Sequence, residues 1–342
     1  MTGLSSEPKL PTLEEVARRA GVSRATVSRA INGGIRVSEK AREAIDRAIA
    51  ELGYIPNRAA RSLVTRRTDS VALVVPETGS KLVGDPFLTG ALQGVTKGLA
   101  GTEFQLVLLI AQHAGDTERL LRYLRAGHVD GALVMSHHRE DHLPSELAKA
   151  KLPCVFLGRP LEPDGANVPY VDVDNVGGAR AATEHLIGRG ARRVATVAGP
   201  SDMPAGVDRL DGWREALQSA GLPDDAVATG DFTAESGASA MRTLLATWPE
   251  LDAVFVASDL MATGAMNVLR EAGRAIPDDV AVIGFDDSML APATVPPLTT
   301  VHQPVEELGH RMAELLLSQL RGETISPGGE ILPTELVIRA SA

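Results

Sequence analysis

Short apolar segments alternate with helix-forming segments along most of this 342-residue chain, from about residue 68 onward. Parallel strands need a crossover between them, usually a helix, so this alternation predicts an α/β fold with parallel sheets. The length favours two sheets over one, and ligands of such sheets bind beyond the carboxyl ends of the strands. The predicted strands are Val71–Val75, Phe104–Ile110, Gly131–Met135, Val155–Gly158, Arg193–Ala198, Ala253–Ala257 and Val280–Phe285.

The first 67 residues carry a charge opposite to that of the rest of the chain. They contain 13 Lys and Arg against 7 Asp and Glu, whereas the remaining residues contain 21 against 37. The formal net charge of −10 therefore hides a basic N-terminal segment. A basic segment on an acidic body concentrates the attraction to phosphate in one place, which indicates a nucleic-acid partner for this segment.

Two short helices are predicted to meet at a tight corner within this basic segment. Thr12 and Glu15 form a capping box that begins the first helix, and Gly21 ends it. Ser23 is placed to cap a second helix, and a third helix is predicted over residues 38–52. In a helix-turn-helix motif the second helix lies in the major groove of DNA. A small helical bundle with solvated charges is the alternative on these features alone.

The second helix has a short, polar and cationic outer face. Arg24 and Arg29 are candidate readers of guanine because a guanidinium group can bond O6 and N7 together, and Ala25 is small enough to contact a thymine methyl group. The other candidates fit contacts that position the helix on the DNA backbone. These candidates are Thr12, Ser23, Thr26, Ser28 and Asn32.

The run from Thr12 to Asn32 resembles the DNA-binding signature of the lactose-repressor (LacI/GalR) family. Residues 53–63 resemble the hinge of that family, in which a short helix folds on DNA and enters the minor groove as a pair from two subunits. The resemblance implies that Asn57 caps this helix, Ala60 lets the paired helices approach, and Leu63 wedges open a base step. It also places two cations near phosphates, Arg58 and Arg61. An ordinary basic linker is the alternative.

The rest of the chain resembles the regulator domain of the same family. The motifs that carry this resemblance are Val171–Gly178, Ala198–Pro200, Arg209–Arg214, Ala257–Met261, Gly284–Asp287 and Pro297–Gln303. The resemblance implies two lobes joined by three crossovers, similar to periplasmic sugar-binding proteins, with an effector in the cleft. The implied effector contacts are Phe87, Arg159, Arg209, Phe232, Ser258, Asp259, Asp286 and Gln303.

Several residues near these motifs are expected to have structural roles instead. Asp174 and Asn175 are placed to cap the following helix, and Asp287 to support Asp286. Cys154, the only cysteine, lies in an apolar run and is expected to fill the core.

The resemblance and the change in pattern predict four parts of the chain. Residues 1–10 form a disordered leader, residues 11–56 the helix-turn-helix domain, and residues 57–67 the hinge helix and linker. Residues 68–342 form the effector-binding and dimerisation domain. Within it, lobe 1 spans about 68–170 and 301–325, and lobe 2 about 171–300 and 326–342.

The effector is expected to be a small sugar. The long loop over residues 76–87 and the runs 57–68 and 199–207 are most similar to the cellobiose-responsive repressors of actinobacteria, which implies a β-linked disaccharide or short oligosaccharide. A purine or a phosphorylated sugar is the alternative effector. A phosphate would need extra cationic residues in the cleft, which Arg159 and Arg209 do not exclude. Aromatic residues make up only 3% of the chain, which is sparse for a sugar site.

Other classes of protein fit the sequence less well. An enzyme is disfavoured because the chain has no phosphate loop, zinc-binding helix pair or nucleophile elbow, and no cofactor is expected. The group of His137, His138, Asp141 and His142 is expected to be a solvated loop rather than a metal site. A secreted solute-binding protein is disfavoured because the first residues lack a signal peptide.

The assembly and location expected from the sequence follow from its ends and its hydropathy. No apolar run reaches the roughly 18 residues that span a bilayer, so a cytoplasmic protein without a membrane partner is expected. Residues 332–342 end as a strand without a leucine heptad, which favours a homodimer over a tetramer. Such a dimer would bind double-stranded, palindromic operator DNA.

Overall fold

The computed structural model describes residues 11–31, 37–55, 67–77, 84–111, 114–139, 142–161, 168–325 and 328–342. The chain divides into two compact units, Met1–Thr68 and Asp69–Ala342. The hinge candidates Asn57, Arg58, Ala60, Arg61 and Leu63 lie outside the described residues, as do Asn32 and the expected leader.

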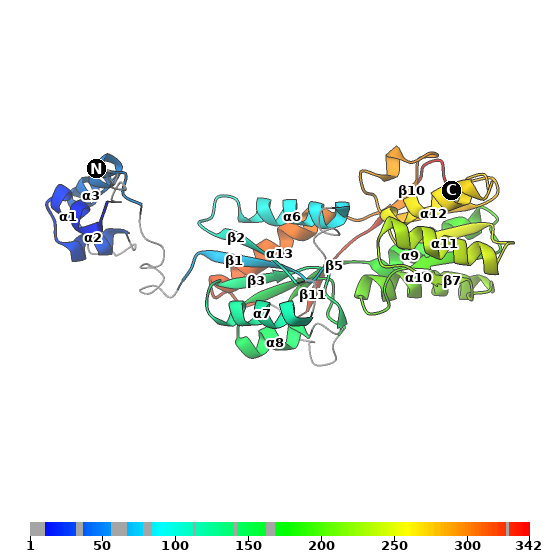
Figure 1. The fold of residues 1–342 in the computed structure, drawn as a ribbon, viewed down its shortest axis with the longest axis horizontal. Helices are drawn as coiled ribbons and strands as arrows, with labels where there is room; N and C mark the ends of the chain where they lie inside the picture. The colour runs from blue at the N-terminus through cyan, green and yellow to red at the C-terminus, as the bar shows by residue number, and fades with distance from the viewer. Residues whose placement is uncertain are drawn as a thin grey trace, which may run out of the picture. The chain divides into compact units, whose positions relative to one another are not determined.

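The described part of the N-terminal unit consists of the helices α1 (Leu13–Ala20), α2 (Arg24–Ile31) and α3 (Glu39–Leu52) (Figure 1). Thr12 Oγ1 accepts a hydrogen bond from Glu15 N at 3.3 Å, and the Glu15 carboxylate accepts one from Thr12 N at 2.8 Å, which is the predicted capping box. Gly21 ends α1 with φ of 69°, a left-handed conformation that favours glycine. Side chains from all three helices form the core: Val16, Ala17, Val27, Ile45 and Ala48.

In the described part of the second unit, the strands form two six-stranded sheets, which define lobe 1 and lobe 2. The lobe 1 sheet has the order β11-β5-β4-β3-β1-β2 and is entirely parallel. Its strands are β1 (Ser70–Val75), β2 (Gln105–Ile110), β3 (Gly131–Val134), β4 (Cys154–Leu157), β5 (Tyr170–Val173) and β11 (Gly329–Leu332). Cys154 is buried in β4, as expected, and burial raises the pKa of its thiol to about 12.

The lobe 2 sheet has the order β12-β10-β9-β8-β6-β7, in which β12 alone is antiparallel. Its strands are β6 (Val194–Ala198), β7 (Val227–Thr229), β8 (Ala253–Val256), β9 (Ala281–Asp286), β10 (Thr299–His302) and β12 (Glu335–Val337). The α/β class with two parallel sheets is therefore confirmed. The bounds of the seven predicted strands differ from those observed by at most one residue.

Helices cover both faces of each sheet (Figure 1). Successive side chains of β1 alternate between two hydrophobic cores, because a strand presents neighbouring residues to opposite faces. In lobe 1 the covering pairs are α6 (Pro86–Leu99) with α13 (Val305–Leu320), and α7 (Ala114–Arg125) with α8 (Leu143–Ala150). In lobe 2 they are α9 (Asn175–Gly188) with α10 (Pro204–Ala220), and α11 (Ala234–Thr247) with α12 (Asp259–Glu271). None of the described helices has both the length and the hydropathy to cross a membrane.

Glycines set the closest contacts between paired helices. A Cβ atom at Gly94 of α6 would collide with the carbonyl oxygen of Glu306 on α13, and one at Gly309 of α13 would collide with a carbonyl oxygen of α6. In lobe 2, Gly237 and Gly264 have the same reciprocal relation between α11 and α12. Each pair therefore packs backbone against backbone, which requires residues without a side chain.

The described chain crosses between the lobes after β5, after β10 and after β11. The first two crossings lie within a few residues of the expected boundaries at 170 and 301. The third differs from the boundary expected at 326, because residues 329–332 extend the lobe 1 sheet as β11 before the chain leaves it. The edge of β5 would otherwise leave backbone groups unpaired, and β11 pairs with them. The apolar pattern of so short a segment does not predict this pairing.

Candidate functional site

A pocket lies at the carboxyl ends of strands from both lobes, and the empty space between its walls is about 750 Å³, including the part open to solvent. This is the position where ligands of parallel α/β sheets bind. Among the described residues, the pocket is lined by Asp85, Phe87, Leu88, Ser136, His137, Leu157, Gly158, Asp172, Asn175, Met203, Pro204, Ala205, Arg209, Phe232, Ser258, Leu260, Asp286, Gln303 and Leu308. The expected contacts among them are Phe87, Arg209, Phe232, Ser258, Asp286 and Gln303.

Arg209, on α10, is the centre of a buried polar network in lobe 2. Its Nε donates to Asn175 Oδ1 at 2.9 Å, and its Nη1 donates to Ala257 O at 2.7 Å and to Asp286 Oδ1 at 3.3 Å. The guanidinium group also lies 3.7 Å from the centre of the Phe285 ring. Burial lowers the pKa of Arg209, and the charge of Asp286 opposes this effect. The network fixes the guanidinium in one orientation beside the pocket.

Asp286 is the carboxylate that this network presents to the pocket. Gln303 Nε2 donates to Asp286 Oδ1 at 2.6 Å. Burial raises the pKa of Asp286 well above its ordinary value, and the positive charge of Arg209 opposes the rise. The backbone φ of Asp286 is 114°, and that of Phe232, another lining residue, is 68°. Non-glycine residues in this region are strained, and such strain is concentrated at ligand-binding positions.

Asn175 has a different role from the one expected. Asp174 alone caps α9, by accepting a hydrogen bond from Gly177 N at 2.8 Å. Asn175 is 2% exposed and donates from Nδ2 to Asp172 Oδ1 at 2.9 Å, while its oxygen accepts from Arg209. Burial raises the pKa of Asp172. Hydrogen bonds that its carboxylate accepts from backbone N–H groups oppose this rise. Asn175 thus links Asp172 to Arg209, and sequence reasoning missed both Asp172 and Asn175 as pocket residues.

Two expected effector contacts lie outside the pocket lining. Arg159 forms an ion pair with Asp208, with Nε to Oδ2 at 3.2 Å, which joins a lobe 1 loop to α10 of lobe 2. Asp259 is fully buried and accepts from Thr300 Oγ1 at 2.6 Å and from Ser288 N at 2.7 Å. Burial raises the pKa of Asp259 to about 6. The ion pair of Arg159 and the hydrogen bonds of Asp259 therefore stabilise the structure around the pocket.

Asp287 also differs in its contacts, because its carboxylate bonds to residues other than Asp286. It accepts from Arg339 Nη2 at 2.6 Å and contacts His302 Nδ1 at 3.1 Å. Asp287 therefore ties β9 to the C-terminal segment and to β10, which is a structural role of the expected kind with different partners.

The loop after β3 is not the solvated loop that the sequence predicted. His137 is 3% exposed and lines the pocket. His138 is partly buried and spans the lobes, with Nδ1 at 2.8 Å from Asp202 of lobe 2 and Nε2 at 3.3 Å from Glu77 of lobe 1. These two carboxylates raise the pKa of His138 to about 9. Among the described residues no group of three or more His, Cys, Asp or Glu side chains could hold a metal ion.

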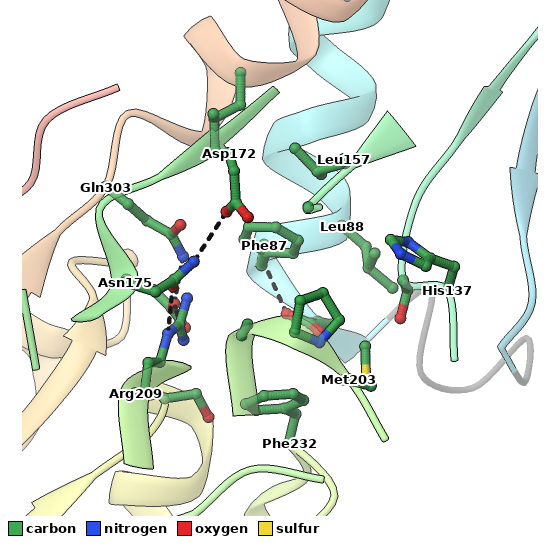
Figure 2. Close-up of a pocket in the computed structure, with 18 of the residues that line it drawn as sticks. Phe87, Leu88, His137, Leu157, Asp172, Asn175, Met203, Arg209, Phe232 and Gln303 are labelled. Atoms are coloured by element: carbon green, nitrogen blue, oxygen red, sulfur yellow. Dashed lines mark hydrogen bonds and ion pairs between the residues drawn. The ribbon is translucent and has the colours of Figure 1, made fainter. Parts of the chain in front are cut away.

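The wall of the pocket in lobe 1 combines apolar side chains with four polar ones, Asp85, Ser136, His137 and Asp172. Figure 2 shows Arg209, Asn175 and Gln303 on one side of the pocket and Leu88 and His137 on the other. In the same view, Phe87 and Phe232 lie between these two sides. The pocket therefore offers a hydrogen-bonded polar network in lobe 2, aromatic surfaces, and a lobe 1 wall of mixed apolar and polar side chains.

In the N-terminal unit, the expected DNA contacts of α2 lie on its outer side. Arg24, Ala25 and Arg29 are exposed, as is Ser23 just before the helix. Arg24 forms an exposed ion pair with Glu14 at 2.7 Å, a contact that a competing phosphate can replace. Thr26 is half-buried and contacts the Ser23 hydroxyl at 2.8 Å. Thr12 is engaged in the capping box, and Ser28 is half-buried on α2.

Comparison with known proteins places both units in one class of regulator. Residues 12–57 match the family described as bacterial regulatory proteins, lacI family, and residues 183–342 match the periplasmic binding protein-like domain. The chain belongs to the LacI family, as the sequence motifs indicated, and is a DNA-binding transcriptional regulator.

Individual relatives share nearly the whole length. The chain is 54% identical to the HTH-type transcriptional regulator CelR of Thermobifida fusca, over 97% of this chain and 98% of that protein. A solved structure described as a CelR–cellobiose complex is 51% identical, with a TM-score of 0.78 and coverage of 97% and 100% of the two chains. The lac repressor dimer bound to operator and the anti-inducer ONPF is 28% identical, with a TM-score of 0.84 and coverage of 97% and 99%.

Proposed function

We propose that this regulator is a repressor of carbohydrate-utilisation genes that a neutral β-linked disaccharide, cellobiose or a close relative, releases from its operator. The observation that carries this proposal is the charge of the pocket. Among the described lining residues, Asp85, Asp172 and Asp286 are carboxylates, and Arg209 is the single guanidinium. Carboxylates accept hydrogen bonds from sugar hydroxyl groups and repel phosphate.

The same charge pattern weighs against a phosphorylated effector. Arg159, which would have been the second cation for a phosphate, is engaged with Asp208 outside the lining. The relative whose structure is described as a cellobiose complex supports the choice of disaccharide, since it is 51% identical over nearly the whole chain.

The regulator is proposed to work as a non-enzymatic cytoplasmic homodimer on a palindromic operator. Each α2 would read one half-site in the major groove through Arg24 and Arg29, and the paired hinge segments would bend the centre of the operator. The effector would bind the DNA-free and DNA-bound states with different affinity, because only such a difference lets a ligand shift the equilibrium between them.

Calorimetric titration of the full chain tests the effector class. We expect heat of binding with cellobiose and none with glucose 6-phosphate or guanine, and cellobiose should weaken binding to a duplex selected from a random pool, measured by fluorescence anisotropy, by about tenfold or more. The variant Asp286→Asn should weaken cellobiose binding, whereas Asp287→Asn, whose carboxylate bonds elsewhere, should leave it nearly unchanged. Binding of only the phosphate or the purine would overturn the sugar assignment.

The DNA-binding surface has its own test. Arg29→Ala should reduce the discrimination between the selected duplex and random DNA by about tenfold, because a bidentate contact to guanine is worth about 1–3 kcal/mol. Arg47→Ala is the matched control, since Arg29 Nε donates to Ala25 O at 3.2 Å and Arg47 Nε donates to Glu43 O at 3.3 Å in the same helical geometry. An equal loss on both DNAs would make Arg29 a phosphate contact.

A further inference from the structure

His137 is a buried polar side chain whose hydrogen-bonding capacity the described residues do not fill with bonds of normal geometry. It follows β3, is 3% exposed and lines the pocket. Among the residues that the structure describes, neither Nδ1 nor Nε2 makes a hydrogen bond of normal geometry. The imidazole instead meets the Phe156 ring edge-on, with the ring centres 5.3 Å apart. Buried polar groups are nearly always hydrogen-bonded, and an unmet one costs about 1–3 kcal/mol.

The polar neighbours of His137 along the chain have their partners within the protein. Ser136 Oγ donates to Glu77 Oε1 at 2.9 Å, and His138 lies between Glu77 and Asp202. The imidazole of His137 therefore has hydrogen-bonding capacity to offer a ligand from the lobe 1 loop after β3.

The ring of His137 suits a neutral hydroxyl group. Burial lowers the pKa of His137 to about 4, with a smaller contribution from the charge of His138, although the backbone carbonyl groups of Arg159 and Leu157, which attract the ring N–H, partly offset the effect. The imidazole is therefore neutral at pH 7, with one nitrogen that donates and one that accepts. A sugar hydroxyl both donates and accepts, whereas a phosphate needs donors and positive charge.

His137 also lies on the opposite side of the pocket from the polar network of lobe 2. In Figure 2, Arg209 and Gln303 are on one side, His137 is on the other, and the rings of Phe87 and Phe232 lie between them. One sugar ring bonded to Arg209 and Asp286 would leave His137 free for a second ring linked to the first.

We propose that His137 determines the length specificity of this regulator: it hydrogen-bonds a hydroxyl group of the second sugar ring in a subsite of lobe 1, while Arg209 and Asp286 hold the first ring in lobe 2. This inference rests on the proposed sugar response. A monosaccharide held by the lobe 2 network does not reach His137, so the energy of this bond is available only to disaccharides and longer sugars. Recognition of the second ring also draws a lobe 1 loop toward the ligand, which ties sugar length to contact between the lobes.

The test compares His137→Leu with His137→Gln. Leucine fills a similar volume without polar atoms, and glutamine restores one donor and one acceptor. By calorimetry at pH 7, His137→Leu should bind cellobiose about 10- to 100-fold more weakly than the unmodified protein, and His137→Gln should recover most of the loss. Weak glucose binding, measured by its competition with cellobiose, should be the same in all three proteins. Leu147→Met, a volume-conserving change at a buried lobe 1 residue outside the lining, should leave cellobiose affinity within about threefold.

The outcomes separate this inference from the proposed function. Unchanged cellobiose affinity in His137→Leu, or an equal loss for glucose and cellobiose, overturns the role of His137 and leaves the sugar response standing. A loss that His137→Gln does not recover also overturns it, because such a loss reflects packing. Failure of the unmodified protein to bind any sugar overturns both. Thermal unfolding of each variant establishes that it is folded, and His137→Met, another apolar change of similar volume, replaces His137→Leu where the latter does not fold.

Discussion

The two walls of the pocket are built on different principles. In lobe 2, Asn175, Arg209, Asp286 and Gln303 bond to one another and to the backbone, so their positions are fixed before a ligand arrives. In lobe 1, apolar side chains such as Phe87 and Leu88 lie beside His137, whose ring nitrogens have no hydrogen bond of normal geometry among the described residues. A preorganised wall holds one orientation of a ligand at low entropic cost, whereas apolar surface such as that of Phe87 and Leu88 accepts different shapes and selects by contact area.

Breaking the polar wall should have the largest effect. Arg209→Met removes a buried cation and leaves Asp286 and the Asn175 oxygen without their partner. We expect cellobiose affinity to fall by more than about 100-fold, since losing one partner of a buried charge pair costs about 2–5 kcal/mol. Calorimetry measures the affinity. Arg214→Met, at a partly exposed position of the same helix outside the pocket lining, is the control and should change it little. Similar effects of the two substitutions would contradict the fixed-wall description.

Removing an aromatic surface should have an intermediate effect. Phe87→Ala deletes a ring that lies between the two sides of the pocket, and the expected loss of cellobiose affinity is about 10- to 30-fold from lost apolar contact. Phe104→Ala, a partly buried phenylalanine outside the lining, is the matched control for the loss of packing. Because Phe87 lies between the two sides of the pocket, we expect Phe87→Ala to lower the affinity for cellobiose and for a longer cello-oligosaccharide by similar factors. Titrations with both sugars measure this.

The contact of His138 with Glu77 and Asp202, which joins the two lobes, should give the smallest effect, and this effect depends on pH. Glu77 and Asp202 raise the pKa of His138 from 6.5 to about 9, so the protonated ring stabilises the folded lobes. The stabilisation is complete below pH 6.5 and is lost as the pH rises from 6.5 through 9. Urea unfolding at pH 6 and pH 9.5 should show a decrease of about 1–2 kcal/mol that is absent in His138→Gln. A pH dependence that persists in His138→Gln would assign the effect to other groups.

Local patterns in the sequence predict much of this fold because their causes are local. The capping box at Thr12 and the long apolar strands depend on residues close in the chain, and they appear where predicted. The unpredicted strands β5, β7, β10 and β11 have three or four residues each, and polar residues such as Asp172 and Thr300 interrupt most of them. These segments form strands because they pair with strands distant in the sequence, and the β propensity of their own residues does not predict such pairing.

The pocket residues were harder to predict from local sequence than the strands. Arg209, Asp286 and Gln303 were predicted as pocket residues through resemblance to a family. Asn175 also fits the pattern of a helix cap, and only the fold shows that its side chain turns inward to Asp172 and Arg209. His137 stands among polar residues that predict a solvated loop. Its position within three residues of the end of an apolar strand was the available signal, because loops at the carboxyl ends of parallel strands surround ligands.

The glycines at the contacts between paired helices affect how a survey of single substitutions would be interpreted. At Gly94, Gly309, Gly237 and Gly264 even alanine would force two helices apart, although none of these residues lines the pocket. A survey of every single substitution would therefore score these positions as intolerant as Arg209. A map of tolerance drawn from such a survey would outline the stiff helix pairs together with the pocket, and ligand titration of each surviving variant would be needed to tell the two apart.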